Sequence, residues 1–260
     1  MPWIEANNIM LHYRMEGPAD APPLVLIHEL GGSLESWNRV LPQLGHRRVL
    51  RWDWRGAGQS EKIRGELALD VLCADLAALM DVLGLAGPAD VAGTALGGGV
   101  ALAFAARMPD RVRKLAVSSP AIGGASGIEA MLRARADQVE QEGMRGQVDI
   151  SLDRSYLPKY RTDASAYQEY RARWISSDPA SYASHNRMLA SMDERANLAK
   201  VTCPTLVLGG EDDALLTPSA MQEIAEAIPS AQYETLASGH FLAVNTPGLW
   251  AETVLPFFDR

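Results

Sequence analysis

Two residues near the end of the chain have the types and the order of an acid and a base that work together. Asp213 follows an apolar, strand-like run, and His240 comes 27 residues later within the segment Ser238-Gly239-His240-Phe241. A carboxylate that hydrogen-bonds one ring nitrogen of an imidazole leaves the other nitrogen free to take a proton from a substrate or from water. The pair therefore predicts general-base chemistry.

A third candidate position lies in a short loop where a nucleophile would be expected. The segment Gly93-Thr94-Ala95-Leu96-Gly97 joins a strand-like run to a helix-like run, and its two glycines let strand and helix approach closely around a sharp turn. The pattern is that of the G-x-S-x-G nucleophile elbow, with Ala95 at the position of the serine. Ala95 has no nucleophilic atom. We do not expect Thr94 to replace it, because neighbouring residues on a tight turn point in different directions.

The loop that opens at His28 has the features of a site for a negative charge. Residues 28–32, His-Glu-Leu-Gly-Gly, follow a buried strand-like run, and a glycine-rich loop in such a place can point backbone N–H groups toward a substrate. Donors of this kind stabilise the oxyanion that forms when a carbonyl is attacked. We expect His28 to hold the shape of the loop. Glu29 would oppose a developing negative charge there, so we expect its carboxylate to face solvent.

Five short apolar runs predict the strands that position these loops. Each run is apolar on both faces, as a buried parallel strand is. The runs end at His28, Asp53, Gly93, Ser119 and Gly210. Helical spacing lies between them, most clearly over 69–83 and 97–108. Strands that alternate with helices predict an α/β fold with a parallel sheet covered on both faces, in which ligands bind at the carboxyl ends of the strands.

The alternation stops over 121–197, which is polar, helix-prone and rich in Arg, Tyr, Ser and Met. Since strand-like runs flank this segment, we interpret residues 1–120 and 198–260 as the core and 121–197 as a helical cap inserted over the strand ends. Some large side chains of the cap either line a pocket or pack helix on helix, and packing is the favoured interpretation. These side chains are Trp174, Met188, Met192 and Tyr156. In the pocket interpretation, Trp174, Met188 and Met192 form the candidate substrate pocket with Glu29 and Phe241.

Together these segments resemble the α/β-hydrolase superfamily over essentially the whole chain. Besides the elbow, HELGGS is similar to that family's HGxGGS loop, and WDWRGAGQS to its DxRGxGxS turn. GGEDDALLTP is similar to its acid loop, and SGHFLAVNTPGLW to its histidine loop. The chain most resembles the 3-oxoadipate enol-lactonase group with the related small esterases and C–C hydrolases. The resemblance implies a mostly parallel central sheet flanked by helices, with an inserted helical cap.

The resemblance also implies roles for residues of this chain. His240 is the implied general base and Asp213 its orienting acid. Asp212 is the second candidate for the acid, because the family's proline usually lies one residue closer to the aspartate. The backbone N–H groups of Leu30 and Leu96 are the implied oxyanion hole.

Other polar residues receive structural interpretations. Asp53 and Arg55 resemble structural members of the DxRGxGxS turn. The remaining histidines have no acid or nucleophile at a recognisable spacing, so we expect them at the surface or in the cap. They are His12, His46 and His185.

Composition limits the partners that the protein can have. With 24 Lys and Arg against 32 Asp and Glu, the net charge is −8, and the chain has no basic run. We therefore expect neither a nucleic-acid nor an anionic-membrane partner, since both depend on neutralising phosphates. Cys73 and Cys203 are isolated, so we expect no metal, and the chemistry needs no cofactor. No signal peptide or membrane span is evident. We expect a cytoplasmic monomer or homodimer that acts on a small molecule.

Ala95 leaves two explanations open. Either it is an engineered replacement of a serine, made to trap substrate in an enzyme that works through an acyl-enzyme, or it is native and the His-Asp pair works without a nucleophile. The leading function is hydrolysis of a small ester, lactone or enol-lactone. A second class is cofactor-free lyase, isomerase or oxygenase chemistry with His240 as the base. A third is a catalytically silent small-molecule binder, against which the retention of Asp213 and His240 argues.

Overall fold

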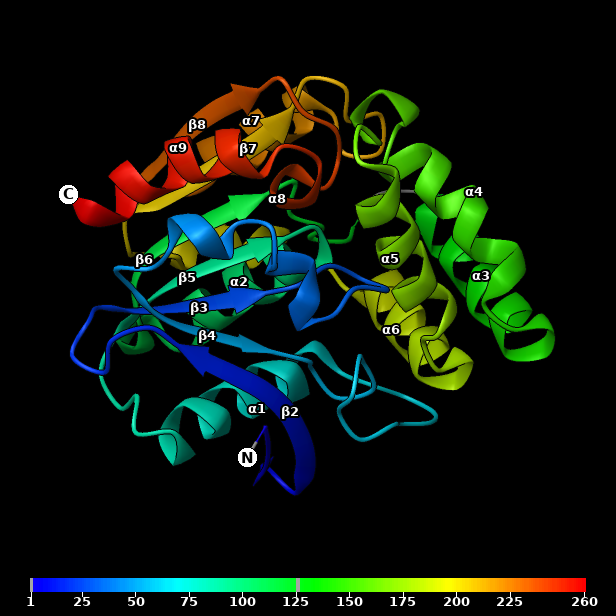
Figure 1. The fold of residues 1–260 in the computed structure, drawn as a ribbon, viewed down its shortest axis with the longest axis horizontal. Coiled ribbons are helices and arrows are strands. Elements are labelled where there is room, and N and C mark those ends of the chain that lie inside the picture. Colours follow the sequence, from blue (N-terminus) through cyan, green and yellow to red (C-terminus); the bar gives the residue numbers. More distant parts are fainter. Residues whose placement is uncertain (1, 125–126) are drawn as a thin grey trace.

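The computed structural model describes residues 2–124 and 127–260 of the chain, which fold around one eight-stranded sheet. The strand order is β1-β2-β4-β3-β5-β6-β7-β8. β1 and β2 pair antiparallel at one edge, and the strands from β4 onward in that order are parallel to one another. The arrowheads of the parallel strands point toward one group of helices, α3 to α6 (Figure 1). The carboxyl ends of the strands therefore face these helices.

The bounds of the elements are as follows. The strands are β1 (Trp3–Ala6), β2 (Ile9–Glu16), β3 (Pro23–Ile27), β4 (Arg48–Trp52), β5 (Ala89–Thr94), β6 (Val112–Ser118), β7 (Thr205–Gly210) and β8 (Ala231–Leu236). The core helices are α1 (Leu69–Val82), α2 (Leu96–Arg107), α7 (Pro218–Glu226), α8 (Leu242–Asn245) and α9 (Pro247–Asp259). Between β6 and β7 lie α3 (Ile128–Glu142), α4 (Arg145–Ser155), α5 (Ala164–Ile175) and α6 (Pro179–Ser191), which we call the cap helices.

Alternate side chains of the central strands build a core on each face of the sheet. In β3, Val25 and Ile27 belong to the cluster that contains α1, α2 and α7, whereas Leu24 and Leu26 belong to the cluster that contains α9. Successive side chains of a strand point to opposite faces, so a strand that is apolar at every position is covered on both. This two-sided burial fixes the register of the sheet and with it the positions of the loops at the strand ends.

The helix that follows the elbow is buried on all sides. Ten consecutive residues of α2, from Leu96 to Ala105, are buried. A helix that is apolar around its whole circumference needs neighbours on every side, and α2 packs on β5, β6 and α1. The elbow is therefore anchored at both ends by buried elements of the core, β5 and α2.

The five predicted strands are confirmed, each ending within one residue of its predicted end, and so are the helices predicted over 69–83 and 97–108. Three strands were not predicted, namely β1, β2 and β8. β1 and β8 are the two edge strands, and β2 lies beside β1. In all three strands exposed or partly exposed residues interrupt the buried pattern. No described helix has the length and apolarity needed to cross a bilayer.

Candidate active site

The predicted acid and base lie against each other at the carboxyl ends of β7 and β8. Nδ1 of His240 lies 2.8 Å from Oδ2 of Asp213. The other carboxylate oxygen accepts hydrogen bonds from the N–H groups of Leu215 and Leu216, each at 2.9 Å. Asp213 is 3% exposed and His240 is 7% exposed. The carboxylate is thus held by three donors, and the imidazole is oriented by the carboxylate.

The environment of Asp213 favours its charged form. Burial by itself raises the pKa of this carboxyl, but the hydrogen bond and the charge interaction with His240, together with the backbone donor of Leu216, outweigh burial and hold the pKa below its ordinary value. A carboxylate that stays ionised fixes the tautomer of His240 with the proton on Nδ1. The outer nitrogen, Nε2, makes no hydrogen bond within the described chain, so it is the nitrogen available to a substrate or water.

Asp212, the alternative acid, lies elsewhere. Its carboxylate accepts a hydrogen bond from the hydroxyl of Tyr160 and pairs with Lys159. Both partners follow α4 in the chain, so Asp212 joins the cap segment to the core. The structure places Asp213, and not Asp212, on His240.

Ala95 occupies the apex of a sharply turned elbow between β5 and α2. Its backbone has φ of 50° and ψ of −119°, a conformation that costs a non-glycine residue about 1 to 3 kcal/mol. Surrounding hydrogen bonds hold it there: its N–H donates to the carbonyl of Ser118 at 2.9 Å, and its carbonyl accepts from Ala121 at 2.9 Å and from Gly99 at 3.1 Å. The strained geometry of a nucleophile elbow is therefore present without a nucleophile.

The two glycines of the elbow are required by close backbone contacts. A Cβ atom on Gly97 would lie 2.2 Å from the carbonyl oxygen of His28, and one on Gly93 would lie 2.3 Å from the carbonyl oxygen of Gly97. Neither position leaves room for a side chain. The contact at Gly97 brings the elbow directly against the loop that follows β3.

Two residues that line the cavity with Ala95 have backbone N–H groups without protein acceptors. Leu96 is the first residue of α2, where the N–H groups of a helix have no partner within the helix and carry its positive dipole end. Leu30 lies in the loop after β3. Within the described chain neither N–H donates to a protein oxygen. Donors so placed can receive a negatively charged oxygen.

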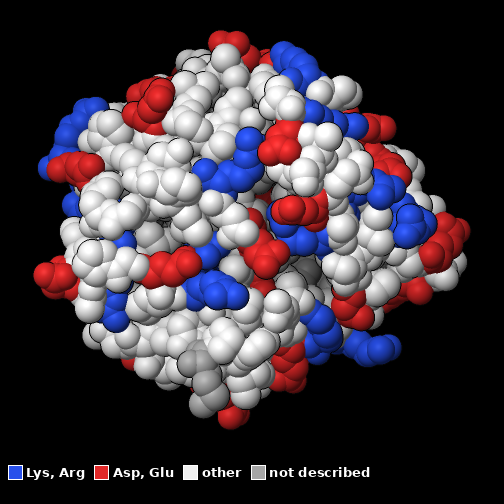
Figure 2. Space-filling model, in the orientation of Figure 1, with Lys and Arg blue, Asp and Glu red and all other residues white. Residues whose placement is uncertain are grey.

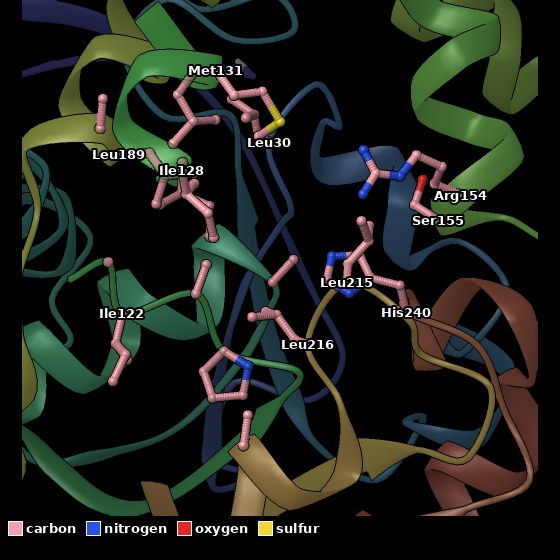
Figure 3. A pocket seen from close by; sticks show the side chains of 18 of the residues that line it. Leu30, Ile122, Ile128, Met131, Arg154, Ser155, Leu189, Leu215, Leu216 and His240 are labelled. Atoms are coloured by element: carbon pink, nitrogen blue, oxygen red, sulfur yellow. The ribbon is translucent and has the colours of Figure 1, made fainter. Parts of the chain in front are cut away.

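A cavity of about 690 Å³ opens over the elbow, between the strand ends and the cap helices (Figure 3). Figure 3 shows His240 and Leu215 on one side of this space, with Ile122 and Leu189 across from them. The wall near the elbow includes Leu30, Ala95, Leu96, Trp174, His240 and Phe241. Four of the five predicted catalytic and oxyanion positions therefore line one cavity, and the fifth, Asp213, is buried behind His240.

The expectation that Glu29 faces solvent is wrong, because its side chain is 0% exposed. Oε1 accepts hydrogen bonds from the hydroxyls of Ser36 at 2.6 Å and Tyr170 at 2.7 Å. Burial, followed by the negative charge of Glu29, raises the pKa of Tyr170 well above its ordinary value, so the phenol stays protonated and donates. Glu29 also does not line the cavity. It lies behind the loop and ties that loop to helix α5 of the cap.

The other pocket candidates divide into two groups. Trp174 on α5 and Phe241 after β8 line the cavity. Met188, Met192 and Tyr156 are buried but are not part of its wall. The pocket assignment of Met188 and Met192 is therefore wrong. The packing interpretation describes them and Tyr156, because all three belong to the buried hydrophobic cluster of the core.

Histidines outside the pair make structural contacts. Nδ1 of His28 bonds to the carbonyl of Glu29 at 2.8 Å, which holds the loop as predicted. His12, expected at the surface or in the cap, is instead buried in the core and bonds to Asp53 at 2.7 Å. Asp53 also accepts the N–H groups of Leu34 and Gln59, so it organises its turn.

His185 is a cap residue, as predicted, but it is fully buried against the core. Its Nε2 lies 2.8 Å from the carbonyl oxygen of Arg55, whose own side chain pairs with Asp75. Burial lowers the pKa of His185 to about 4, although the hydrogen bond to the Arg55 carbonyl acts in the opposite direction. His46 lies at the surface, with its side chain 52% exposed.

Most residues of the cavity wall were not predicted from the sequence, and two of them carry polar side chains that lack a partner. Tyr182 on α6 lines the cavity with a hydroxyl that makes no hydrogen bond within the described chain, and no local pattern distinguishes it from a packing residue. Arg154 on α4 also lines the cavity. It lies on the same face of α4 as Gln147, Ser151 and Ser155, and this helical spacing of polar residues could have been recognised in the sequence. The described residues hold no cluster of three or more His, Cys, Asp or Glu side chains arranged to bind a metal ion.

Comparison with known proteins places the chain among enzymes. The profile of the family described as serine aminopeptidase, S33, matches residues 23–239. The chain is 28% identical over 261 residues to 3-oxoadipate enol-lactonase 2 of Acinetobacter baylyi, covering 99% of this chain and 96% of that protein. It is 27% identical to the putative carbamate hydrolase RutD of Azorhizobium caulinodans, covering 99% and 98%.

Solved structures agree with these sequence relatives. The crystal structure of the enol-lactonase from Burkholderia xenovorans LB400 superposes with a TM-score of 0.94 and 30% identity, covering 100% of both chains. A hydrolase from Pseudomonas aeruginosa PA01 superposes with a TM-score of 0.93 and 29% identity, covering 99% of this chain and 98% of that one. The chain therefore belongs to the serine aminopeptidase S33 family of the α/β-hydrolase superfamily, among esterase- and lactonase-type hydrolases similar to the enol-lactonase group.

Proposed function

We propose that the protein hydrolyses a small-molecule carboxylic ester, lactone or enol-lactone. His240 acts as the general base and Asp213 orients it, while the N–H groups of Leu30 and Leu96 form the oxyanion hole. The observation that carries the proposal is the bond between Nδ1 of His240 and Asp213 beside a cavity that Ala95 also lines. The names of the relatives, an enol-lactonase and a putative carbamate hydrolase, support the attack of water on a carbonyl group.

With Ala95 at the elbow, water takes the place of the serine hydroxyl. Nε2 of His240 removes a proton from the water as its oxygen bonds to the carbonyl carbon, and the carbonyl electrons move to the oxygen held by the two N–H groups. When the C=O bond re-forms, the bond to the leaving oxygen breaks, and the imidazolium returns its proton to that oxygen. Every step uses a group of this chain, the water or the substrate.

We also propose that residues 121–197 act as a cap on a core formed by residues 1–120 and 198–260. The cap helices supply Trp174, Tyr182 and Leu189 to the cavity, opposite the strand ends. Their contacts with the core, such as the bond from Tyr170 to Glu29, support a cap that stays attached while it shapes the site.

Product analysis in ¹⁸O-labelled water tests the reaction class. Hydrolysis of an ester or lactone incorporates one labelled oxygen into the carboxylate product. His240→Ala should lower kcat by about a hundred- to ten-thousand-fold, since no other group at the elbow can act as the base. The His46→Gln variant, which changes an exposed histidine, is the control and should keep full activity.

Cofactor-free lyase or isomerase chemistry is the second candidate, and the absence of a nucleophile at Ala95 favours it. A base beside two N–H donors can remove a proton next to a carbonyl and hold the resulting enolate. A rearranged or cleaved product without the label, lost in His240→Ala, would support this class against hydrolysis. Turnover that survives in His240→Ala would overturn both candidates.

A further inference from the structure

One side chain of the cap segment contacts both loops that carry the acid–base pair. Tyr160 belongs to the connection between α4 and α5, which lies beside the loops after β7 and β8 (Figure 1). The hydroxyl of Tyr160 donates a hydrogen bond to the carboxylate of Asp212, the residue directly before Asp213. The ring lies against Gly239, the residue directly before His240, where an added Cβ atom would lie 3.2 Å from Cε2 and 3.3 Å from Cδ2 of the ring. Tyr160 therefore touches the neighbour of the acid and the neighbour of the base.

The two loops also contact each other through their main chains. The N–H group of Asp212 donates to the carbonyl of Ser238 at 3.0 Å. A Cβ atom on Gly210, the last residue of β7, would lie 2.4 Å from the carbonyl oxygen of Gly239. Tyr160 thus lies where the loop of the acid meets the loop of the base. Since the next residue in each loop is a member of the pair, a displacement of either loop at this point changes the geometry of the pair.

The turn that presents Tyr160 is fixed to helix α4. The guanidinium of Arg161, the next residue, donates to the carbonyl oxygens of Tyr156 at 2.8 Å and Leu152 at 3.2 Å. These carbonyls lie at the C-terminal end of α4, where a basic side chain interacts favourably with the helix. The ring of Pro158 also restricts the backbone of the turn. Tyr160 is therefore held by the cap segment.

The phenol and the carboxylate are in the protonation states that their hydrogen bond requires. Lys159, and after it Tyr160, holds the pKa of Asp212 below its ordinary value, so the carboxylate is charged and accepts. Burial, followed by the bond to Asp212, raises the pKa of Tyr160, so the phenol is protonated and donates. A hydrogen bond with a charged partner is stronger than one between neutral groups.

The neighbouring ion pair of Lys159 with Asp212 is of an ordinary kind. Figure 2 shows basic and acidic side chains interspersed over the face that it presents, and the side chain of Lys159 is 56% exposed. Ion pairs that solvent reaches contribute little to stability. Tyr160 is instead partly buried against the core, with its hydroxyl on one loop and its ring on the other. The tyrosine, and not the lysine, is therefore the contact that can control the two loops.

We propose that Tyr160 is a positioning residue for the acid–base pair. It sets the relative position of Asp213 and His240 from the cap, so that the pair is fully assembled only while the cap segment is in place. Tyr160 is not part of the cavity wall, so it acts through the residues before Asp213 and His240 and not through the substrate. The inference rests on the proposed function for the catalytic role of the pair, and it names the part of the cap that controls the pair.

Exchange of the Nδ1 proton of His240 with water tests the proposal without turnover. This proton lies between His240 and Asp213, and it exchanges with water when the pair opens. Proton NMR with saturation transfer from water measures the exchange rate, and the resonance is assigned by its absence in His240→Gln. Tyr160→Phe keeps the ring and removes the hydroxyl, so the rate should rise about tenfold, which is the effect of losing one hydrogen bond to a charged group.

Further variants separate this hydrogen bond from attachment of the cap in general. Asp212→Asn keeps an oxygen that accepts from Tyr160 and should exchange as slowly as the wild type, whereas Asp212→Ala should match Tyr160→Phe. Ser181→Ala is the matched control, because the hydroxyl of Ser181 on α6 bonds to the backbone of Ile63 at 3.0 and 3.1 Å and so ties the cap to the core at another place. It should leave the exchange rate unchanged. Amide spectra show whether each variant is folded.

Three outcomes would overturn the proposal. The first is the lack of a protected Nδ1 resonance in the wild-type protein, since there would then be no held pair to position. The second is equal exchange in Tyr160→Phe and the wild type. The third is equally fast exchange in Tyr160→Phe and Ser181→Ala, which would indicate only a general loosening of the cap. Failure of the proposed hydrolysis would appear as product without the ¹⁸O label, so the two failures remain distinguishable.

Discussion

The buried histidine that joins the cap to the core should make stability depend strongly on pH. His185 has a pKa lowered from 6.5 to about 4, chiefly by burial, with the nearby His28 and Lys62 acting in the same direction. In the unfolded chain the imidazole regains its ordinary pKa. As the pH falls below about 6.5 the unfolded state takes up a proton that the folded state refuses, so the free energy of unfolding decreases.

The size of this effect follows from the two pKa values. The full difference, reached near pH 4, is about 3 kcal/mol, because one pKa unit corresponds to about 1.4 kcal/mol. Between pH 7 and pH 5 about 2 kcal/mol of it develops. This is a large fraction of the stability of an ordinary domain, about 5 to 15 kcal/mol.

Urea unfolding of the wild-type protein and His185→Gln at pH 7 and pH 5 measures the effect. Glutamine does not titrate and can still donate a hydrogen bond to the carbonyl of Arg55. Other groups also titrate between these pH values. We therefore compare the decrease in the free energy of unfolding from pH 7 to pH 5 in the variant with the same decrease in the wild type. The loss should be smaller in His185→Gln by about 2 kcal/mol.

The His46→Gln variant is the control for a histidine on the surface, and its loss should match that of the wild type. An equal loss in His185→Gln and the wild type would refute the reasoning. It would mean that His185 is charged in the folded state or is exposed to water there. In either case α6 would not exclude water from its contact with the loop that contains Arg55.

The remaining predictions concern the elbow and the loop beside it. Ala95→Ser adds one hydroxyl to an elbow that already has the required backbone. If the alanine replaces a serine, kcat for an aryl ester should rise by several orders of magnitude in this variant, and a serine-directed phosphonate should label the protein. No gain and no labelling would favour nucleophile-free chemistry. Glu29→Gln keeps an acceptor for Ser36 and Tyr170, and residue 29 lies outside the cavity wall, so kcat and its pH profile should stay unchanged. Glu29→Ala leaves the two hydroxyls without an acceptor, so it should lower the free energy of unfolding measured in urea by about 2 to 4 kcal/mol. A fall in kcat with Glu29→Gln at unchanged stability would place Glu29 in the mechanism.

Features that depend on neighbouring residues in the chain could be predicted from the sequence. The strand ending at Gly210 is apolar at every position, so its burial on both faces follows from its own residues. The elbow around Ala95 was recognisable because two glycines at fixed spacing impose a close approach. The order of Asp213 and His240 on successive strand ends likewise placed them together at one edge of the sheet.

Features that depend on distant residues could not be predicted. Glu29 is buried because Ser36, 7 residues away, and Tyr170, 141 residues away, provide its donors, and nothing around position 29 indicates either. The direction of Met188 and Met192 depends on how α6 is rotated against its neighbours, which helical spacing alone does not define. His12 was missed for the same reason, because its partner Asp53 comes from another strand.

The close approach of the Gly97 backbone to the carbonyl oxygen of His28 makes the arrangement of the two loops independent of the side chain at residue 95. Because main chain meets main chain there, the separation of the N–H groups of Leu30 and Leu96 is set by backbone atoms and not by the side chains at those positions. Residue 95 can therefore be exchanged among small amino acids while the proposed oxyanion hole remains assembled, whereas any side chain at position 97 would push the two loops apart. Under the proposed function, the same backbone would serve a covalent mechanism with a hydroxyl at residue 95, and a water-based mechanism or a proton transfer without one.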